Sequence, residues 1–207
     1  TGKTLLIQEE EIAHIESLKG VAAAYPLVEE NVFVKYGNKE TLAILIGTDT
    51  SYLSMYRLRE GQLSFNKGET NYTIVGLDLA RELGIRTRFL TPLKLFFPKK
   101  RGEISITNPL ESINEQIIYP SALLDDINNT RAKALYVKTD IAKGLTGMSE
   151  NEFSSIEIFL QTQSDKQTVR EKLESILPDS IVKDKAQQNA TLYKMMKAEK
   201  LAVYLIL

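Results

Sequence analysis

Three consecutive cations, Lys99, Lys100 and Arg101, form the sharpest charge cluster in the sequence. They follow the apolar run LKLFFP and open a polar stretch that ends near Asn114. Clustered positive charge on a loop attracts an acidic partner, so these three side chains are the candidate partner-binding loop. A cationic turn that protects a strand end from aggregation is an alternative explanation. The length of the stretch 99–114 favours function, because long loops more often carry it.

Other residue types that support chemistry have simpler explanations here. The first four residues, TGKT, resemble the end of a phosphate-binding P-loop, but an apolar run follows where that motif requires a helix. His14 lies in a charged helical segment without a nearby nucleophile, so we expect a solvated surface residue. The segment 125–129 contains two aspartates and two asparagines without the regular spacing of an EF-hand loop, which favours an Asx-rich turn.

The composition argues against several classes of function. The 207 residues include 26 Lys+Arg and 27 Asp+Glu, and this balance argues against nucleic acid as a partner, since nucleic-acid binders need a basic face. With no Cys and one His, thiol catalysis, disulfides and Cys- or His-rich metal sites are excluded. We expect no cofactor and no metal. A hydrolase built on a Ser–Lys or carboxylate pair remains an alternative.

Both ends of the sequence are predicted to form strand–helix–strand units. Near the N-terminus, apolar residues spaced three apart over 12–18 predict a helix that stops at Gly20. Residues 21–28 then predict a strand. The two β-rich runs within 31–47 flank a Gly-Asn-Lys turn, which predicts a hairpin.

The C-terminal unit repeats this order. Alternating apolar residues over 154–162 predict a strand. Ser164 and Gln167 have capping-box spacing at the start of a helix, which Pro178 ends, and residues 180–184 predict a returning strand. The helix carries one apolar stripe formed by Val169, Leu173, Ile176 and Leu177.

The middle of the sequence is richer in short strands and turns. Four strands are predicted at 72–76, 93–98, 115–124 and 133–137. A short helix, LDLARELG, lies among them and stops at Gly84. The fold class is therefore α+β, a split βαβ sheet-and-helix subdomain with an inserted β-rich subdomain. The predicted segments are 1–48 and 152–184 for the α+β subdomain, 49–151 for the insertion and 185–207 for a C-terminal helix.

The C-terminal helix changes character along its length. A polar helical stretch over 185–200 runs into LAVYLIL, which is shorter than the roughly 20 residues that span a bilayer. We expect a stalk that enters a truncated transmembrane helix, with Glu199 and Lys200 as candidate stalk residues. A buried C-terminal helix is the alternative.

Three motifs in a fixed order carry a resemblance to a known family. Gly-Val at 20–21, Pro-Leu-Val-Glu at 26–29 and Gly-Thr-Asp at 47–49 resemble the start of the periplasmic domain of lipoprotein-releasing ABC transporter permeases, the LolC/LolE type of the MacB-like and FtsX-like permease superfamily. The string IVGLDLARELGI is similar to the family's Gly-x-x-Leu-Ala-x-x-Leu-Gly. The ending NATLYKMMKAEKLAVYLIL is similar to its approach to the second transmembrane helix.

The resemblance implies a periplasmic domain of a bacterial inner-membrane permease. Its α+β part would be the family's Porter and its β-rich insertion the Sabre, without catalytic residues, because a separate cytoplasmic subunit or domain binds ATP. The implied partners are a second permease protomer, in a homo- or heterodimer, and that ATPase. The lipoprotein-releasing branch adds lipoproteins and a soluble periplasmic carrier, recruited by a hairpin hook at about the place of 99–114. MacB-like efflux, mechanotransmission and an extracytoplasmic sensor domain of a membrane receptor remain alternatives.

Overall fold

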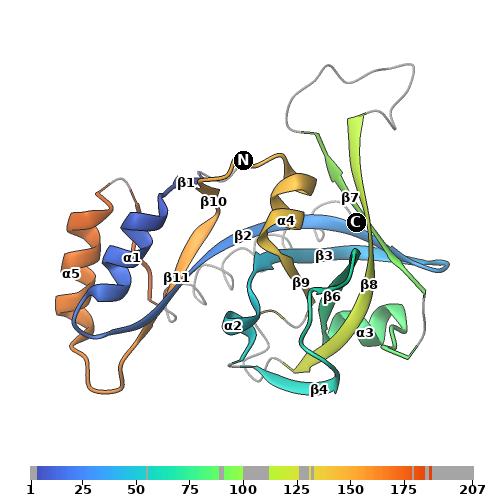
Figure 1. The fold of residues 1–207 in the computed structure, drawn as a ribbon, viewed down its shortest axis with the longest axis horizontal. Coiled ribbons are helices and arrows are strands. Elements are labelled where there is room, and N and C mark those ends of the chain that lie inside the picture. Colours follow the sequence, from blue (N-terminus) through green and yellow to red (C-terminus); the bar gives the residue numbers. More distant parts are fainter. Residues whose placement is uncertain are drawn as a thin grey trace, which may run out of the picture.

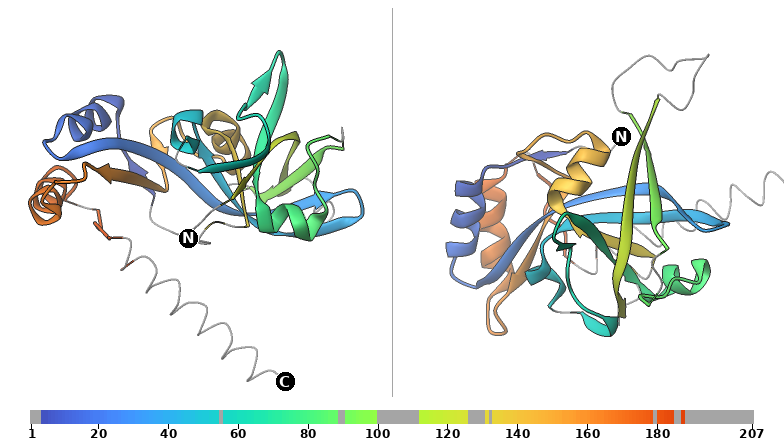
Figure 2. Two further views of the ribbon diagram at one scale, coloured as in Figure 1. Left: turned by 90° about the horizontal axis from the view of Figure 1, so that it is seen from below. Right: turned by 45° about the vertical axis from the view of Figure 1, so that its right-hand side comes forward.

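The fold is described from a computed structural model. It describes residues 4–54, 56–88, 91–99, 112–125, 131, 133–178, 180–184 and 187. Within these residues the chain is elongated, with two helices and a small sheet at one end and a larger strand assembly at the other (Figures 1 and 2). This mixed α/β architecture with one large sheet agrees with the predicted fold class at that level.

Six strands form the larger assembly. Neighbours pair in the order β8-β7-β2-β3-β9-β6, and a parallel β6–β8 ladder joins the last strand to the first, so the path closes on itself. We call these six strands the strand ring. They are β2 (Val21–Tyr36), β3 (Lys39–Thr48), β6 (Thr70–Gly76), β7 (Leu93–Pro98), β8 (Ile113–Asp125) and β9 (Ala134–Lys138). β4 (Arg57–Gly61) adds to β8, and β5 (Asn66–Lys67) adds to β6.

Alternation of side chains along each strand divides the core into two clusters. One set of positions, including Val34, Leu45 and Leu95, faces the inside of the ring, where α3 (Leu77–Leu83) and α4 (Thr139–Thr146) pack. The alternate positions face outward, and part of that outer surface is covered by α2 (Thr50–Leu53) with Tyr52 and Leu53. The ring thus buries apolar side chains on its inside and, where α2 covers it, on part of its outer face.

The opposite end of the molecule is built from two segments far apart in the sequence, residues 5–27 and 152–176. β11 (Ser155–Leu160) pairs antiparallel with residues 21–27 of β2, and β1 (Leu5–Leu6) pairs with β10 (Glu152–Phe153). The helices α1 (Glu9–Ser17) and α5 (Lys166–Ile176) bury Ile15, Val169 and Leu173 in the same cluster as the inside of the ring. We call α1, α5, β11 and residues 21–27 the terminal layer.

Most predicted elements are confirmed. The hairpin turns at Gly37, whose φ of +58° a glycine adopts readily, and pairs Tyr36 with Lys39. The four middle strands and the helix ending at Gly84 also lie where they were predicted. The helix α4 was not predicted, and residues 21–28 were predicted as a strand separate from the hairpin. They are one strand, because β2 exchanges β11 for β3 as its ladder partner at Val28 without a break.

Two predictions at the C-terminal unit are wrong. The Ser164 hydroxyl donates to the Gln161 carbonyl and closes a turn, so Asp165 is the N-cap instead and accepts the Gln167 N–H at 3.0 Å. Residues 180–184 do not form a strand; Ile181 is 80% exposed, and the Val182 carbonyl accepts a hydrogen bond from Arg170 rather than from a neighbouring strand.

The predicted segment boundaries remain predictions. A parallel ladder pairs residues 44–48 of β3 with β9, which lies within the predicted insertion 49–151. The hairpin therefore shares a sheet with strands on the other side of the boundary. The stretches 185–186 and 188–207, which include the expected stalk residues Glu199 and Lys200, lie outside the described residues.

Candidate functional site

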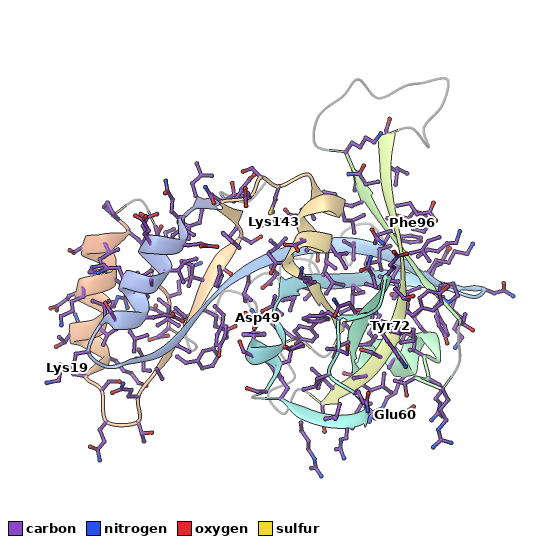
Figure 3. The ribbon with its side chains drawn as sticks, viewed as in Figure 1. Lys19, Asp49, Glu60, Tyr72, Phe96 and Lys143 are labelled. Atoms are coloured by element: carbon purple, nitrogen blue, oxygen red, sulfur yellow. The ribbon has the colours of Figure 1, made fainter. Side chains whose placement is uncertain are left out.

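The most concentrated group of interacting polar side chains that we find lies where the terminal layer meets the strand ring. It contains Glu29 from β2, Glu157 from β11, Tyr52 from α2 and Arg131, which precedes β9. Figure 3 labels Asp49, the residue before α2, beside this junction. We call these four residues, together with Tyr56, the junction network.

Arg131 bridges two carboxylates from different strands. Its Nη1 donates to Glu157 Oε2 at 2.7 Å, and its Nη2 donates to Glu29 Oε2 at 3.1 Å. The side chain of Arg131 is 18% exposed, whereas those of Glu29 and Glu157 are 37% and 31% exposed. The guanidinium thus forms hydrogen bonds from both terminal nitrogens in a largely buried position, where such bonds are stronger than at the surface.

The helix α2 places Tyr52 in the network. The Asp49 carboxylate caps this short helix by accepting the Ser51 and Tyr52 N–H groups at 2.8 Å and 3.2 Å. The Tyr52 hydroxyl donates to Glu157 Oε2 at 2.5 Å, accepts from Arg131 and lies 3.0 Å from the Tyr56 hydroxyl. Its ring packs edge-on against Tyr25 of the terminal layer at 5.4 Å.

Electrostatics fix the protonation states of the two central groups. Burial raises the pKa of Tyr52 far above its ordinary value, and the Arg131 charge only partly opposes this effect. Burial by itself lowers the pKa of Arg131, but the charges of Glu157 and Glu29 oppose this effect, and the pKa lies above its ordinary value. Tyr52 therefore stays a neutral donor and Arg131 stays charged throughout the physiological pH range.

The arrangement is suited to holding parts together. The Glu29 N–H donates to Ser154 Oγ at 2.8 Å, and the Ser154 hydroxyl donates back to the Glu29 carbonyl at 3.0 Å, so β2 is tied to the start of β11. Arg131 then ties β11 to the ring through Glu157, while its bond to Glu29 lies within the ring. Since β2 itself runs through both parts without a break, the junction has a continuous strand and a charged cross-brace.

The predicted site residues lie elsewhere. The strands β7 and β8 form an antiparallel arm that projects from the ring (Figure 1). Lys99 directly follows β7 at the end of this arm, where its N–H donates to the Ser112 carbonyl at 2.9 Å and its side chain is exposed. Lys100, Arg101 and the rest of the loop to residue 111 lie outside the described residues. His14 is exposed on α1, as expected.

The predicted Asx turn is only partly described. Asp125 forms an ion pair with Arg59 at 2.6 Å, whereas residues 126–129 lie outside the described residues. Among the residues that the structure describes, no cluster of three or more His, Asp or Glu side chains could hold a metal ion. No helix in this part of the chain combines the length and the apolar character that crossing a bilayer demands.

Sequence reasoning did not identify the junction network, although a signal was present. Glu29 is the acidic residue of the Pro-Leu-Val-Glu motif, and Asp49 is that of the Gly-Thr-Asp motif. Gly47, the first residue of the same Gly-Thr-Asp motif, allows α4 to approach β3, because a Cβ there would lie 2.4 Å from the Ala142 Cβ. Two motifs that supported a resemblance thus also position the junction, but nothing in their spacing pointed to Arg131.

Comparisons with known proteins identify the fold. No protein-family model and no curated protein sequence matches the chain. Among solved structures, the periplasmic region of MacB from Actinobacillus actinomycetemcomitans is similar over 84% of this chain and 73% of its own, with a TM-score of 0.56 and 11% identity. The extracellular domain of the ABC-type transporter YknZ from Gram-positive bacteria is similar over 79% of this chain and 78% of its own, with a TM-score of 0.51 and 14% identity. The chain therefore has the fold of MacB-like extracytoplasmic domains.

Proposed function

We propose that this chain is the extracytoplasmic domain of an ABC transporter permease subunit. The observation that carries the proposal is the shared fold with the MacB and YknZ domains, which covers more than three quarters of this chain in both cases. The domain would lie on the periplasmic side of a bacterial inner membrane. Its partners would be a second permease protomer and a cytoplasmic ATPase that performs all of the ATP hydrolysis.

Within this class, we propose the lipoprotein-releasing type. Support comes from the order of the motifs at 20–49, at 76–84 and at the ending that starts with Asn189, together with the arm formed by β7 and β8. The stretch 99–114, which connects these strands, would recruit a soluble carrier through Lys99, Lys100 and Arg101. Lipoproteins and this carrier would then be the cargo and its acceptor.

The junction network supports a mechanical role for the domain. An ATP-driven movement of the terminal layer would reach the arm formed by β7 and β8 only if β2 stays straight at residues 27–28, where the terminal layer joins the strand ring. The ion pair of Arg131 with Glu157 of β11 resists that bending, because bending separates the largely buried guanidinium from a partly buried carboxylate, while the pair with Glu29 holds Arg131 on the ring side. Movement at one end would then displace the arm at the other.

The experiment uses the complete transporter in membrane vesicles. Arg131→Met should leave basal ATP hydrolysis within about two-fold and should lower cargo release at least ten-fold, since hydrolysis and junction lie in different parts. Lys133→Met is the matched control, because its ion pair with Glu82 at 2.7 Å joins exposed side chains away from the junction. Equal release by both variants refutes the mechanical role. The transporter assignment itself is refuted if the full-length protein, purified from membranes, has no associated ATPase.

A further inference from the structure

The helix α4 lies between the terminal layer and the arm formed by β7 and β8 (Figure 1). It packs on the inside of the strand ring and contacts both strands of the arm, whereas Tyr52 of the junction network packs on the outside. After its C-cap, Gly147, the chain continues through a short turn into β10 and then β11. The helix therefore connects the two parts of the molecule by a route that does not include Arg131.

One side chain attaches the arm to the last turn of α4. The Asn114 amide of β8 donates to the Leu145 carbonyl at 2.8 Å in a partly buried position. The last carbonyls of a helix have no partner within the helix itself. A longer helix would bring the Ser149 N–H to this carbonyl, but the chain turns at Gly147, where φ is +71°, and that N–H donates to Glu152 Oε2 at 3.1 Å. Asn114 supplies the missing donor and thereby fixes the arm to the helix.

The same turn of α4 is attached to the terminal side through Lys143. Its ammonium donates to the Glu150 carbonyl and lies 3.6 Å from the centre of the Phe153 ring of β10. Burial lowers the pKa of Lys143, so the ammonium is partly removed from water, where a cation–π contact is stronger. The next carbonyl along the chain, that of Asn151, accepts the Ile7 N–H at 2.9 Å just before α1. Lys143 thus holds the segment that also anchors the start of α1.

The two attachments act in series. Asn114 belongs to the arm, the partners of Lys143 belong to the segment that leads into the terminal layer, and both bonds end on residues 143–145 of one helical turn. A rigid element that is bonded at both ends carries a displacement from one end to the other. Loss of either bond would interrupt this connection.

We propose that α4 sets the direction of the arm relative to the terminal layer, with Asn114 and Lys143 as its two positioning residues. A movement of the terminal layer then turns the arm through the inside of the ring, in addition to any movement carried by β2 and Arg131. The inference concerns distances within this chain, so it does not depend on the transporter assignment.

The test measures distances between pairs of spin labels by double electron–electron resonance. Because the sequence has no cysteine, introduced cysteines carry the only labels. Glu10→Cys with Lys99→Cys reports the arm against the terminal layer, and Glu10→Cys with Glu40→Cys reports the hairpin against the same layer; all three positions are exposed. Asn114→Leu and Lys143→Met should each at least double the width of the first distance distribution and leave the second unchanged.

Attachment in series makes the effects of the two changes non-additive. The double variant Asn114→Leu/Lys143→Met should give the same width as either single variant, whereas independent damage to packing would add. Asn114→Gln and Lys143→Arg keep a donor and should keep the narrow distribution. Gln116→Leu is the matched control, because the Gln116 amide lies two residues along β8 and donates to the adjacent Ile117 carbonyl at 2.9 Å. It should leave both distributions unchanged.

Each of four results would overturn the proposal. An unchanged first distribution in both single variants shows that other contacts hold the arm. Equal broadening for both label pairs shows a general loosening of the fold. Equal broadening by Gln116→Leu shows that β8 itself, rather than α4, sets the direction. Widths that add in the double variant show that Asn114 and Lys143 do not act through one helix.

Discussion

Replacing Arg131 by methionine tests the junction network most directly. The change keeps an apolar stem of similar length but removes the bridge to Glu29 and Glu157 and leaves two carboxylates partly buried without their cation. A hydrogen bond to a charged group in a protein interior contributes about 1.5–3 kcal/mol, and exposed pairs contribute less than about 1 kcal/mol. Because each carboxylate is about one third exposed, we expect a loss of about 2 kcal/mol. For a chain of this size the midpoint of thermal unfolding should fall by about 6 °C.

A double-mutant cycle separates the bridge from general damage to the fold. Urea unfolding followed by circular dichroism would compare Arg131→Met, Glu157→Gln and the double variant. Since both changes remove the same ion pair, the double variant should be about 1 kcal/mol more stable than the sum of the two losses predicts. The control Lys133→Met should cost less than about 0.5 kcal/mol, because its ion pair is exposed. A coupling energy below about 0.3 kcal/mol would refute the role assigned to the bridge.

Three further predictions follow from other parts of the molecule. Gly47→Ala should lower the free energy of unfolding in urea by about 2 kcal/mol, because the new Cβ would lie 2.4 Å from that of Ala142. Gly144→Ala in α4, where nothing lies within 4 Å of the new Cβ, should stabilise the fold by about 0.5 kcal/mol. The opposite order would contradict the packing of α4 on β3. A hydrogen bond from Thr168, and then the Gln167 N–H, lower the pKa of Asp165, so its contribution to stability is present above about pH 3.9 and is lost as the pH falls through the folded-state pKa. Asp165→Asn should therefore lower the unfolding midpoint near pH 6 and match the unchanged protein near pH 2, and a constant difference would count against the cap. Charge reversal at positions 99–101 should slow association with an acidic-surfaced carrier about ten-fold without changing the unfolding midpoint, and unchanged capture in a pull-down would remove this loop from the carrier site.

The elements with strong local signals were predictable. The hairpin at Gly37 and the helix ending at Gly84 depend on glycine conformations that neighbouring residues cannot supply, and both lie where they were predicted. The start of α5 was misplaced by one residue because Ser164 and Asp165 are both good N-caps, and the turn to Gln161 decided between them. The strand predicted at 180–184 failed because its alternation is local, whereas a strand also needs an edge to pair with.

The sequence by itself excluded thiol chemistry and Cys- or His-rich metal sites, and it determined the local periodicity of the strands and helices. It has no cysteine and one histidine, and its apolar spacing allows strands over most of its middle. Only the tertiary structure decided which strands close the ring, which residues cover its outer face and which charges meet at the junction. Arg131 and Glu29 are about a hundred residues apart in the chain, and they meet because β3 pairs with β9 on one side and with β2 on the other. Such long-range pairing depends on surfaces that exist only after the strands have folded, and local sequence patterns cannot encode it.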